Sequence, residues 1–355
     1  MIDVVESPEA VSAQWMTQVL TQSGHLDGGK VVDLDCDIIG TGKMGDNARF
    51  TLRYDSVQSK APTTVVGKFP ARDPATRQMA GAQGAYYNEV MFYREFAGRT
   101  DMRTPHIFAN AISEDRQTFT LIMEDLSPDK PGSQLVPATL SQLQHVAKEA
   151  AKLSASFYGD PTLAEVDFIQ SPLTDGGGAI AQAYLQQCWP GFLERFGDAL
   201  SDDCKAFGTR YVDHHNAVTT RFQGPRTLAH GDLRAENILF GETGCCVIDW
   251  QTMIEASPLT DLAYFMGSSL DVADRRSWER EVVAQHSELL AALGVALSVE
   301  ECWSQYREQS MHGLTLTILG ASFTAPDPRG DAMFRTVIQR QLQHCLDMNA
   351  AEFFP

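Results

Sequence analysis

The sequence predicts an α+β protein with a small, β-rich first part and a larger, mainly helical second part. Short stretches of apolar or alternating residues, which are typical of strands, occur early in the chain. These strand candidates are residues 31–39, 48–54, 63–69 and 119–126. Apolar residues between 140 and 157 instead recur with a period of about 3.6, as on the buried face of a helix. The turn-rich segment 127–132 (SPDKPG) separates the two patterns, so we expect an N-terminal domain over 1–126 and a C-terminal domain over 127–355.

The chain is expected to begin with a helix and a strand that lead into a glycine-rich turn. Ser7 and Pro8 are typical of an N-cap and a first helical position, and Gly24 is a typical helix stop. The turn Gly40–Gly45 (GTGKMG) has the form GxGxxG, which suits two folds. A dinucleotide-binding turn would open a helix next, whereas a kinase nucleotide loop would open a strand. The alternation over 48–54 predicts a strand, which makes Gly42 and Gly45 candidates for contact with nucleotide phosphates.

A lysine and a glutamate form the second candidate group. Lys68 lies in the strand 63–69, where a kinase keeps the lysine that bridges the α and β phosphates. The simpler interpretation is a solvated lysine at a strand end. Residues 85–97 are expected to be helical, and Glu89 shares a face with apolar neighbours at helical offsets, while Glu95 points about 120° away. We therefore expect Glu89 to be the partner of Lys68.

The second part is expected to consist mostly of helices. Beyond 140–157, the helical stretches are 179–196, 202–222, 278–293, 298–316 and 335–353. Pro258 and Asp261 open a further helix between them. His214 and His215 are adjacent, and on a helix they project about 100° apart, so a surface or capping role is expected rather than a shared metal ion.

The segment 230–240 (HGDLRAENILF) carries the most specific signal in the chain. Asn237 lies five residues after Asp232, and Asp249 lies twelve residues after Asn237. This spacing suits phosphoryl transfer, which needs one carboxylate near the attacking hydroxyl and oxygen ligands for magnesium. Apolar residues on both sides of the turn Gly241–Gly244 predict a hairpin that ends just before Asp249, with Cys245 and Cys246 as core filler.

These residues resemble the aminoglycoside phosphotransferase and choline kinase superfamily, whose loop reads HGDxxxxN. Gly231 stands where protein kinases carry arginine, which favours a small-molecule kinase. Within the superfamily, the chain is most similar to the ecdysteroid-kinase-like branch. The segments Asp249–Gln251 and Asp261–Phe265 match that branch, whereas Arg234 stands where the branch often has tryptophan.

The resemblance implies a bilobal, protein-kinase-like fold and a role for each motif residue. Asp232 would accept the hydroxyl proton, Asn237 and Asp249 would coordinate Mg²⁺, and Lys68 held by Glu89 would grip the phosphates of ATP. Adenine would lie where the strand 119–126 runs into the linker. There Met123 would line the site, while the Glu124 carbonyl and the Leu126 amide would bind the adenine edge. His230 and Asp261 would brace the loop, although Asp261 is equally compatible with a simple acid at a helix N-terminus.

Composition excludes several other classes. The net charge of −18 argues against nucleic acid or an anionic membrane surface as partner. The acidic N-terminus lacks an apolar core, so no secretory signal is expected, and no run of about twenty apolar residues predicts a membrane span. Seven cysteines without a CxxC motif are typical of reduced thiols in a cytoplasmic protein.

The sequence therefore predicts an ATP-dependent kinase that phosphorylates a hydroxyl of a small molecule. A pseudokinase would normally lack one of the motif residues, and a protein kinase would need a longer segment between Asp249 and Asp261. Two chemical classes of acceptor are compatible with the sequence. Residues 127–355 carry a net charge of −13, which would suit a cationic amine or an aminoglycoside. The branch resemblance and the aromatic residues of this part instead favour a neutral, hydrophobic alcohol, which is our expectation.

Overall fold

The computed structural model describes residues 2–40, 44–56, 60–171, 173 and 176–355. The chain forms two compact units. The first contains residues 1–99, 104–128 and 248–251, and the second contains 100–103, 129–247 and 252–355. The sequence places the boundary after residue 126, whereas the units divide after Pro128. The sequence also does not indicate that the segment with Asp249 joins the first unit.

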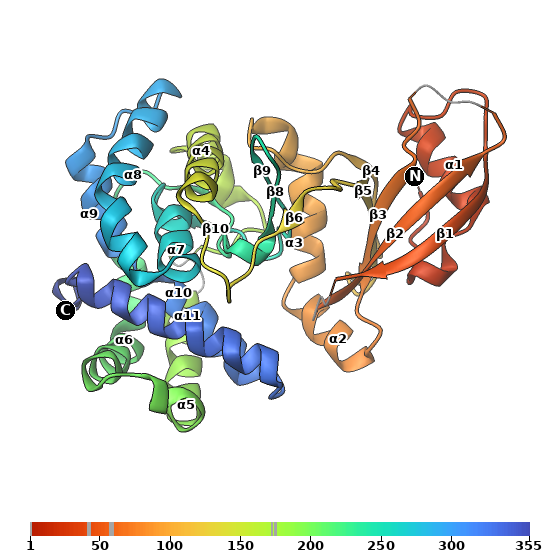
Figure 1. Ribbon diagram of the computed structural model, residues 1–355. Helices are drawn as coiled ribbons and strands as arrows, with labels where there is room; N and C mark the ends of the chain where they lie inside the picture. The colour runs from red at the N-terminus through yellow and green to blue at the C-terminus, as the bar shows by residue number, and fades with distance from the viewer. Residues whose placement is uncertain (1, 41–43, 57–59, 172, 174–175) are drawn as a thin grey trace. The chain divides into compact units, whose positions relative to one another are not determined.

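The first unit is built on an antiparallel sheet of five strands in the order β1-β2-β3-β5-β4 (Figure 1). The strands are β1 (Val31–Ile39), β2 (Gly45–Tyr54), β3 (Thr64–Pro70), β4 (Ile107–Ile112) and β5 (Phe119–Glu124). Its helices are α1 (Ala13–Gln22), α2 (Pro74–Ala82) and α3 (Ala85–Met91), and α3 continues as a π-helical turn over Phe92–Phe96. The predicted strands are confirmed, and β4 is an additional strand.

Each face of this sheet is covered by a different helix, because side chains of a strand alternate between faces. Ile122 of β5 packs with α1, whereas Leu121 and Met123 pack with α3. On β3, Val65 packs on the α1 side and Val66 on the α3 side. Lys68 has the parity of Val66, so its side chain lies on the face covered by α3.

The first helix differs from the prediction. Residues Pro8–Ala10 form one 3₁₀ turn, and α1 begins only at Ala13. Ser12, rather than Ser7, is the N-cap of α1, because its side chain accepts a hydrogen bond from the Trp15 amide at 3.1 Å.

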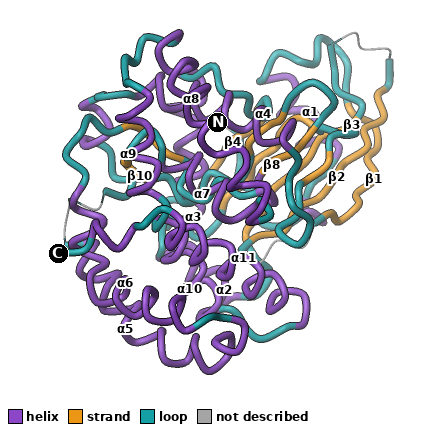
Figure 2. Tube along the Cα trace, turned by 60° about the vertical axis from the view of Figure 1, so that its left-hand side comes forward, coloured by secondary structure: helices purple, strands orange, loops and turns teal. Residues whose placement is uncertain are grey.

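The second unit is mainly helical (Figure 2). Its helices are α4 (Leu140–Phe157), α5 (Gly177–Phe196), α6 (Asp202–Arg221), α7 (Thr260–Ser269), α8 (Val272–Ala292), α9 (Val299–Gln309), α10 (His312–Phe323) and α11 (Pro328–Asp347). All ten residues of α7 are buried, and α7 packs against α4, α8, α9, α10 and α11. A helix at this position can present polar side chains to the interior of the unit, and two of them, Asp261 and Tyr264, bond the loop at residues 230–232.

In the described part of the second unit, five short strands flank the loops. They are β6 (Lys130–Pro131), β7 (Thr227–Ala229), β8 (Ile238–Phe240), β9 (Cys245–Val247) and β10 (Ile254–Ala256). β10 pairs with β7, and β6, β8 and β9 form a second sheet. The segment His230–Asn237 connects β7 to β8, so both ends of the predicted catalytic loop are held by strands.

The helix predicted over 298–316 is wrong, because α9 ends at Gln309 and α10 begins at His312. No proline or glycine marks the break at Ser310 and Met311, so the sequence pattern could not locate it. The Ser310 hydroxyl bonds the Arg307 carbonyl at 2.8 Å, and such a bond competes with continued helix. The predicted helices 278–293 and 335–353 also begin earlier, at Val272 and Pro328.

The surface role expected for His215 is wrong, since this side chain is buried and its Nδ1 lies 3.0 Å from the Tyr211 hydroxyl. Burial lowers the pKa of His215 to about 4. A histidine whose pKa is lowered in the folded state stabilises the protein above its unfolded pKa of about 6.5, and this stability is lost as the pH falls from 6.5 toward 4.

We expect the unfolding free energy to fall by roughly 2 kcal/mol between pH 6.5 and pH 5 because of His215. In this range the unfolded state binds one proton that the folded state does not, which changes the unfolding free energy by about 1.4 kcal/mol per pH unit. Urea unfolding of wild type and His215→Gln at the two pH values measures this. The variant should lose that share of the pH dependence, whereas the control His214→Gln should retain it. An unchanged pH dependence in His215→Gln would contradict the assignment.

Candidate active site

The backbone of the predicted catalytic loop is held by Asp261, near the start of α7. The Oδ2 of Asp261 accepts a hydrogen bond from the His230 amide at 2.8 Å, and Oδ1 accepts one from the Gly231 amide at 3.1 Å. Asp261 is buried, so both bonds are shielded from water. The bracing role expected for Asp261 is confirmed, and it goes beyond that of a simple N-terminal helix acid.

Gly231 is required by the conformation of the loop. Its φ of +82° lies in the left-handed region that glycine adopts most easily. A Cβ atom at this position would lie 2.1 Å from the carbonyl oxygen of Thr252, which is far inside van der Waals contact. No residue with a side chain fits here unless the backbone moves. This explains why the loop has glycine at position 231, where protein kinases have arginine.

Both oxygens of the Asp232 carboxylate have partners. The Asn237 Nδ2 donates to Asp232 Oδ2 at 3.0 Å and to the Asp232 carbonyl at 2.9 Å. The Tyr264 hydroxyl donates to Oδ1 at 2.7 Å. The structure thus brings Asp232 and Asn237 together as predicted. Tyr264 was not predicted, although its position three residues after Asp261 places the two on the same face of α7.

Charged side chains around Asp232 balance one another. Arg234 Nε lies 3.4 Å from Asp232 Oδ2, and Arg234 Nη1 lies 4.0 Å from Glu236. Arg329 Nη2 lies 3.3 Å from the other carboxylate oxygen of Glu236. Two acids and two arginines therefore meet at this end of the loop, and their formal charges cancel.

The predicted hairpin is present. Ile238 pairs with Val247, and Gly241 donates its amide to the Gly244 carbonyl at 2.9 Å to close the turn. Cys245 and Cys246 are buried, which confirms their expected place in the core. Asp249 follows the hairpin with a φ of +70°, a conformation that is rare for residues with a side chain and is enriched at functional sites.

In the first unit, Lys68 lies between two carboxylates. Its Nζ lies 2.7 Å from Glu89 Oε2 and 2.7 Å from Asp249 Oδ1. The predicted choice of Glu89 over Glu95 is confirmed. Lys68 is 9% exposed and Glu89 is 1% exposed. Burial disfavours the charge on Lys68, but the two carboxylates outweigh it and hold its pKa above the usual value, so the lysine remains a cation.

The residues after Asp249 fix this segment to α3 and the π-helical turn that follows it. The Trp250 ring stacks on Phe92 with centroids 3.6 Å apart and planes at 5°. Gln251 Nε2 donates to Glu89 Oε2 at 3.2 Å, and the Gln251 carbonyl accepts a bond from Asn88 at 3.0 Å. Trp250 and Gln251 therefore hold both Asp249 and Glu89 in place, a role that the sequence did not reveal.

The glycine-rich loop is described in part. Gly42 lies outside the described residues. Gly45 begins β2, and a Cβ there would lie 2.6 Å from the Phe69 carbonyl oxygen, so a side chain does not fit. The Met44 carbonyl accepts a bond from the Tyr86 hydroxyl of α3 at 2.7 Å, which ties the end of the loop to the helix that carries Glu89.

The expected adenine-binding segment is anchored by an ion pair. Met123 and Leu126 are buried and Glu124 is exposed. Between them, Asp125 accepts bonds from Arg49 Nε at 2.8 Å and from Arg49 Nη2 at 3.2 Å. A bidentate pair of this kind fixes orientation as well as position.

The oxygen donors suit a magnesium ion. Magnesium prefers hard oxygen ligands and is usually held by one or two carboxylates together with phosphate oxygens. Asn237 donates two hydrogen bonds through Nδ2, and its Oδ1 is a neutral oxygen of the kind that can coordinate a metal ion. The Asp249 side chain is 36% exposed, and its Oδ1 bonds Lys68 Nζ at 2.7 Å, so it places a second carboxylate group beside the lysine.

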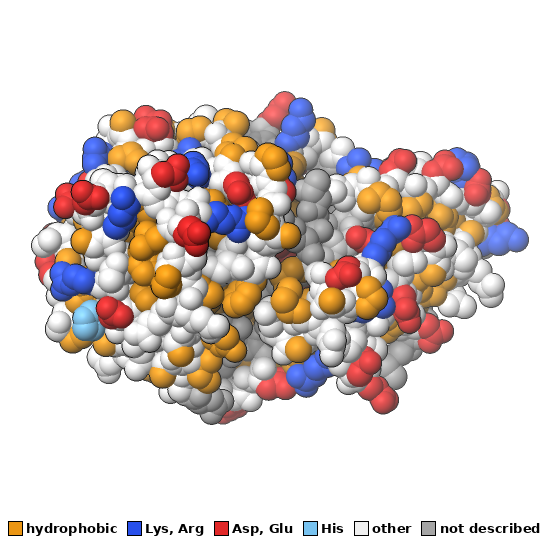
Figure 3. Space-filling view, turned by 90° about the horizontal axis from the view of Figure 1, so that it is seen from below, with side chains coloured by type: hydrophobic (Ala, Val, Ile, Leu, Met, Phe, Trp, Pro, Cys, Tyr) orange, Lys and Arg blue, Asp and Glu red, His pale blue; other side chains and the backbone are white. Residues whose placement is uncertain are grey.

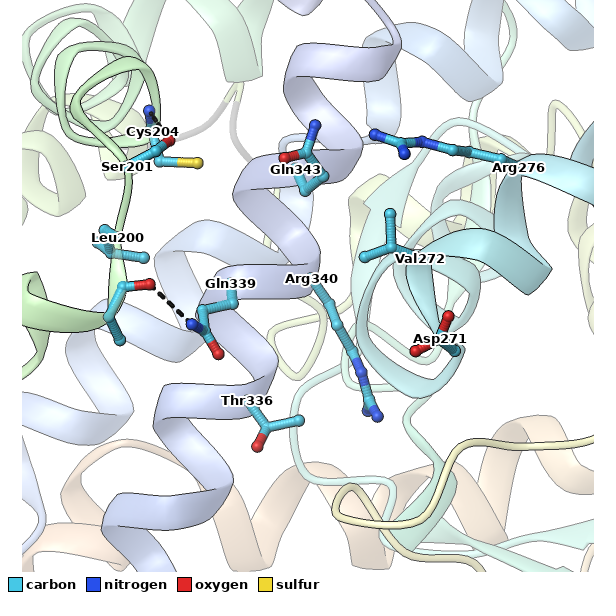
Figure 4. Close-up of a pocket in the computed structure, with 11 residues that line it drawn as sticks. Leu200, Ser201, Cys204, Asp271, Val272, Arg276, Thr336, Gln339, Arg340 and Gln343 are labelled. Carbon is cyan, nitrogen blue, oxygen red and sulfur yellow. Dashed lines mark hydrogen bonds between the residues drawn. The ribbon is translucent and has the colours of Figure 1, made fainter.

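A pocket of about 500 Å³ lies elsewhere in the second unit (Figure 4). Polar and apolar residues from the start of α6, the start of α8 and the middle of α11 line it, and Gln339 donates to the Ala199 carbonyl at 2.7 Å. None of the predicted site residues lines this pocket, so we assign it no role in phosphoryl transfer.

The fold and these two clusters define the class of protein. A buried lysine–glutamate pair beside a β-sheet, together with an HGD loop braced by a helix aspartate, characterises kinase-like phosphotransferases that act on hydroxyl groups of small molecules.

The chain belongs to the ecdysteroid kinase-like family, whose model matches residues 44–294. The predicted family and enzyme class are thereby confirmed. A comparison with curated proteins found no match. Within the described ranges, no helix is long and apolar enough to cross a membrane.

Solved structures show the same fold at low sequence identity. The choline kinase from Cryptosporidium parvum Iowa II has a TM-score of 0.52 and 10% identity, covering 97% of this chain and 98% of that one. The ADP-bound aminoglycoside phosphotransferase APH(2'')-Ib has a TM-score of 0.51 and 14% identity, covering 94% of this chain and 99% of that one. The protein-kinase-like α+β architecture predicted from the sequence is confirmed.

Proposed function

We propose that the chain transfers the γ-phosphate of ATP to a hydroxyl group of a neutral, largely apolar small molecule. The observation that carries the chemistry is the Asp232 carboxylate, fixed between Asn237 and Tyr264. In the reaction, the acceptor O–H proton passes to Asp232 and the acceptor oxygen bonds the γ-phosphorus. The bond from phosphorus to the β-phosphate oxygen then breaks, and ADP leaves.

The first unit would supply the nucleotide contacts. Lys68, held by Glu89, would bind the phosphate oxygens, because it remains charged although it is buried. Gly42 and Gly45 would approach the phosphates through the backbone. Met123, Glu124 and Leu126 would receive adenine on the segment that Asp125 and Arg49 anchor.

We assign the metal-ligand roles to Asp249 and Asn237. A bound Mg²⁺ would neutralise charge on the phosphate oxygens. The unusual backbone of Asp249 and its contact with Lys68 support this assignment, since strained residues with charged partners are typical of functional sites.

The balanced charges near Asp232 support a neutral acceptor. A site for a polycation would need uncompensated carboxylates. Here Arg234 lies beside Asp232, and Glu236 is shared by Arg234 and Arg329. The net charge of −13 over residues 127–355 would favour an amine, but the two described acids at this end of the loop, Asp232 and Glu236, each have an arginine partner.

An apolar surface begins beside the same loop. His312 Nε2 lies 2.7 Å from the Gly231 carbonyl at the start of α10. Residues 312, 316, 319 and 323 fall on one stripe of α10, and Leu316 and Leu319 are partly exposed. Phe323 is 59% exposed and meets Tyr184 of α5, which is 50% exposed, with ring centroids 6.4 Å apart.

Ile180 is 57% exposed and lies four residues before Tyr184, on the same side of α5. We call Ile180, Tyr184, Leu316, Leu319 and Phe323 the α5/α10 apolar face. It would hold the apolar body of the acceptor, since exposed apolar surface of this kind marks binding sites. Hydrophobic side chains gather in patches on the helical unit, with charged side chains scattered between them (Figure 3). From His312 to Phe323 the helix extends roughly 16 Å, which is long enough for a polycyclic alcohol.

The acceptor class is tested by the dependence of activity on salt. We expect phosphorylation of sterols or other apolar alcohols, with a KM for the alcohol that is unchanged between about 50 mM and 500 mM salt, because salt screens only charged interactions. We expect Phe323→Ser to raise that KM by about tenfold, which corresponds to the loss of about half the burial energy of a large apolar side chain.

The matched control is Leu293→Ser, which changes an exposed apolar residue at the end of α8 and should leave the KM unchanged. Efficient, salt-sensitive phosphorylation of kanamycin-like compounds or choline, with no activity on any apolar alcohol, would overturn the choice of acceptor. ATP binding without turnover on any acceptor would instead favour a pseudokinase.

A further inference from the structure

We propose that Tyr264 is a positioning residue for phosphoryl transfer, whose hydroxyl fixes the plane of the Asp232 carboxylate against the acceptor hydroxyl. This inference rests on the proposed function, because it assigns Tyr264 a role in orienting the group that accepts the proton. Tyr264 belongs to α7, the helix whose Asp261 already holds the backbone of the same loop.

Asp232 needs such a partner because its terminal torsion has no sharp minimum. The carboxylate plane of an aspartate rotates in a broad well, unlike the staggered torsions of aliphatic side chains. Asn237 donates to Oδ2 at 3.0 Å and Tyr264 donates to Oδ1 at 2.7 Å, so the two oxygens are held from different elements. Rotation of the carboxylate would break both bonds, and the remaining lone pairs therefore keep a fixed direction.

The Tyr264 ring cannot follow a moving carboxylate. A Cβ on Gly313 would lie 2.6 Å from Cδ2 and Cε2 of Tyr264, so the ring is seated directly on the glycine backbone of α10. The His312 ring meets it edge-on, with centroids 5.6 Å apart and planes at 89°. Because His312 also contacts the Gly231 carbonyl, the start of α10 fixes both the loop and the tyrosine.

Tyr264 acts as a hydrogen-bond donor throughout the accessible pH range. It is 4% exposed, and burial together with the neighbouring Asp232 charge raises its pKa well above the usual value. The phenol therefore keeps its proton and does not compete with Asp232 as a base. A hydrogen bond from a buried neutral donor to a carboxylate belongs to the stronger class of protein hydrogen bonds.

The test is the Tyr264→Phe variant, which keeps the ring on Gly313 and removes only the hydroxyl. We expect kcat to fall about 10- to 100-fold, the range for loss of one hydrogen bond to a charged group. The KM for ATP should stay within about twofold of wild type, because the Tyr264 hydroxyl bonds Asp232, which would face the acceptor rather than the nucleotide.

A double-mutant cycle separates positioning from general damage to the fold. In the Asp232→Asn background, the same Tyr264→Phe change should cost less than about threefold in residual kcat, because the group that it orients is already disabled. The matched control is Tyr306→Phe, which removes another buried hydroxyl of the second unit, bonded to Glu279 at 3.3 Å, and should leave kcat unchanged. Thermal unfolding of each variant checks that the fold is kept.

The outcomes separate the role of Tyr264 from the proposed phosphotransferase function. A kcat for Tyr264→Phe within about twofold of wild type, or an equal loss in both backgrounds, overturns the role of Tyr264 and leaves the proposed function standing. A wild-type protein that phosphorylates no hydroxyl acceptor overturns the proposed function and, with it, the role of Tyr264. A large loss in wild type that disappears in Asp232→Asn supports both.

Discussion

The Asp249→Asn variant is expected to lose turnover by roughly 10³-fold or more while keeping its fold, since removing one preorganised electrostatic contact already costs about 10²–10³-fold. A carboxylate supplies a charged ligand to Mg²⁺, and a neutral amide of the same shape cannot replace that charge. Lys68 would also lose one of its two acidic partners, although it would keep Glu89.

Asparagine is the informative substitution because of the backbone at this position. Asp249 has a φ of +70°, and asparagine is one of the few residues that accept the left-handed region readily. Alanine would add backbone strain to the loss of charge and would confuse the two effects. Circular dichroism and thermal unfolding should therefore show a folded protein, and calorimetry should show that Mg²⁺ no longer strengthens ATP binding.

The control for this variant is Asp213→Asn, which makes the same charge change on an exposed position of α6. It should phosphorylate at the wild-type rate. Near-normal phosphorylation by Asp249→Asn would remove Asp249 from the metal site. A variant that fails to fold would show instead that Asp249 is needed chiefly as a partner of Lys68.

The sequence predicts those features that depend on neighbours along the chain. Strand alternation places the Lys68 side chain on the α3 face of the sheet, and helical offsets turn Glu89 rather than Glu95 toward that lysine. The 2.7 Å contact between Lys68 and Glu89 therefore follows from the strand period of two and the helix period of about 3.6 residues. The hairpin after Asn237 depends on a turn and two short apolar strands, all of which are local. Bracing by Asp261 was implied only by the family resemblance, and a simple acid at a helix N-terminus was left open as the alternative.

The features that were not predicted depend on distant parts of the chain. Tyr264 meets Asp232 and His312 meets Gly231 only because α7 and α10 pack beside the loop, and no local pattern encodes that packing. His215 was expected at the surface, because the histidine pair gives no sign that α10 will supply Thr315 near its ring. Asp249 was assigned to the second part of the chain, yet its contacts with Lys68 and the α3 region make it part of the first unit.

The Asp232→Ala variant is expected to reduce turnover by about 10²–10⁴-fold, the usual range for a positioned acid–base group. ATP affinity should change little, because Asp232 would contact the acceptor rather than the metal or the nucleotide. Single-turnover rates and ATP affinity from calorimetry measure the two effects separately.

Two further variants decide how the loss in Asp232→Ala is interpreted. Asp232→Asn keeps an oxygen that can accept a bond from Tyr264 but cannot accept the acceptor proton, so it should be nearly as slow as Asp232→Ala. Glu242→Gln removes an exposed carboxylate from the turn of the following hairpin and should leave turnover unchanged. If ATP affinity collapsed in Asp232→Ala while turnover per bound ATP survived, the roles assigned to Asp232 and Asp249 would have to be exchanged, since only a metal or nucleotide ligand would give that pattern.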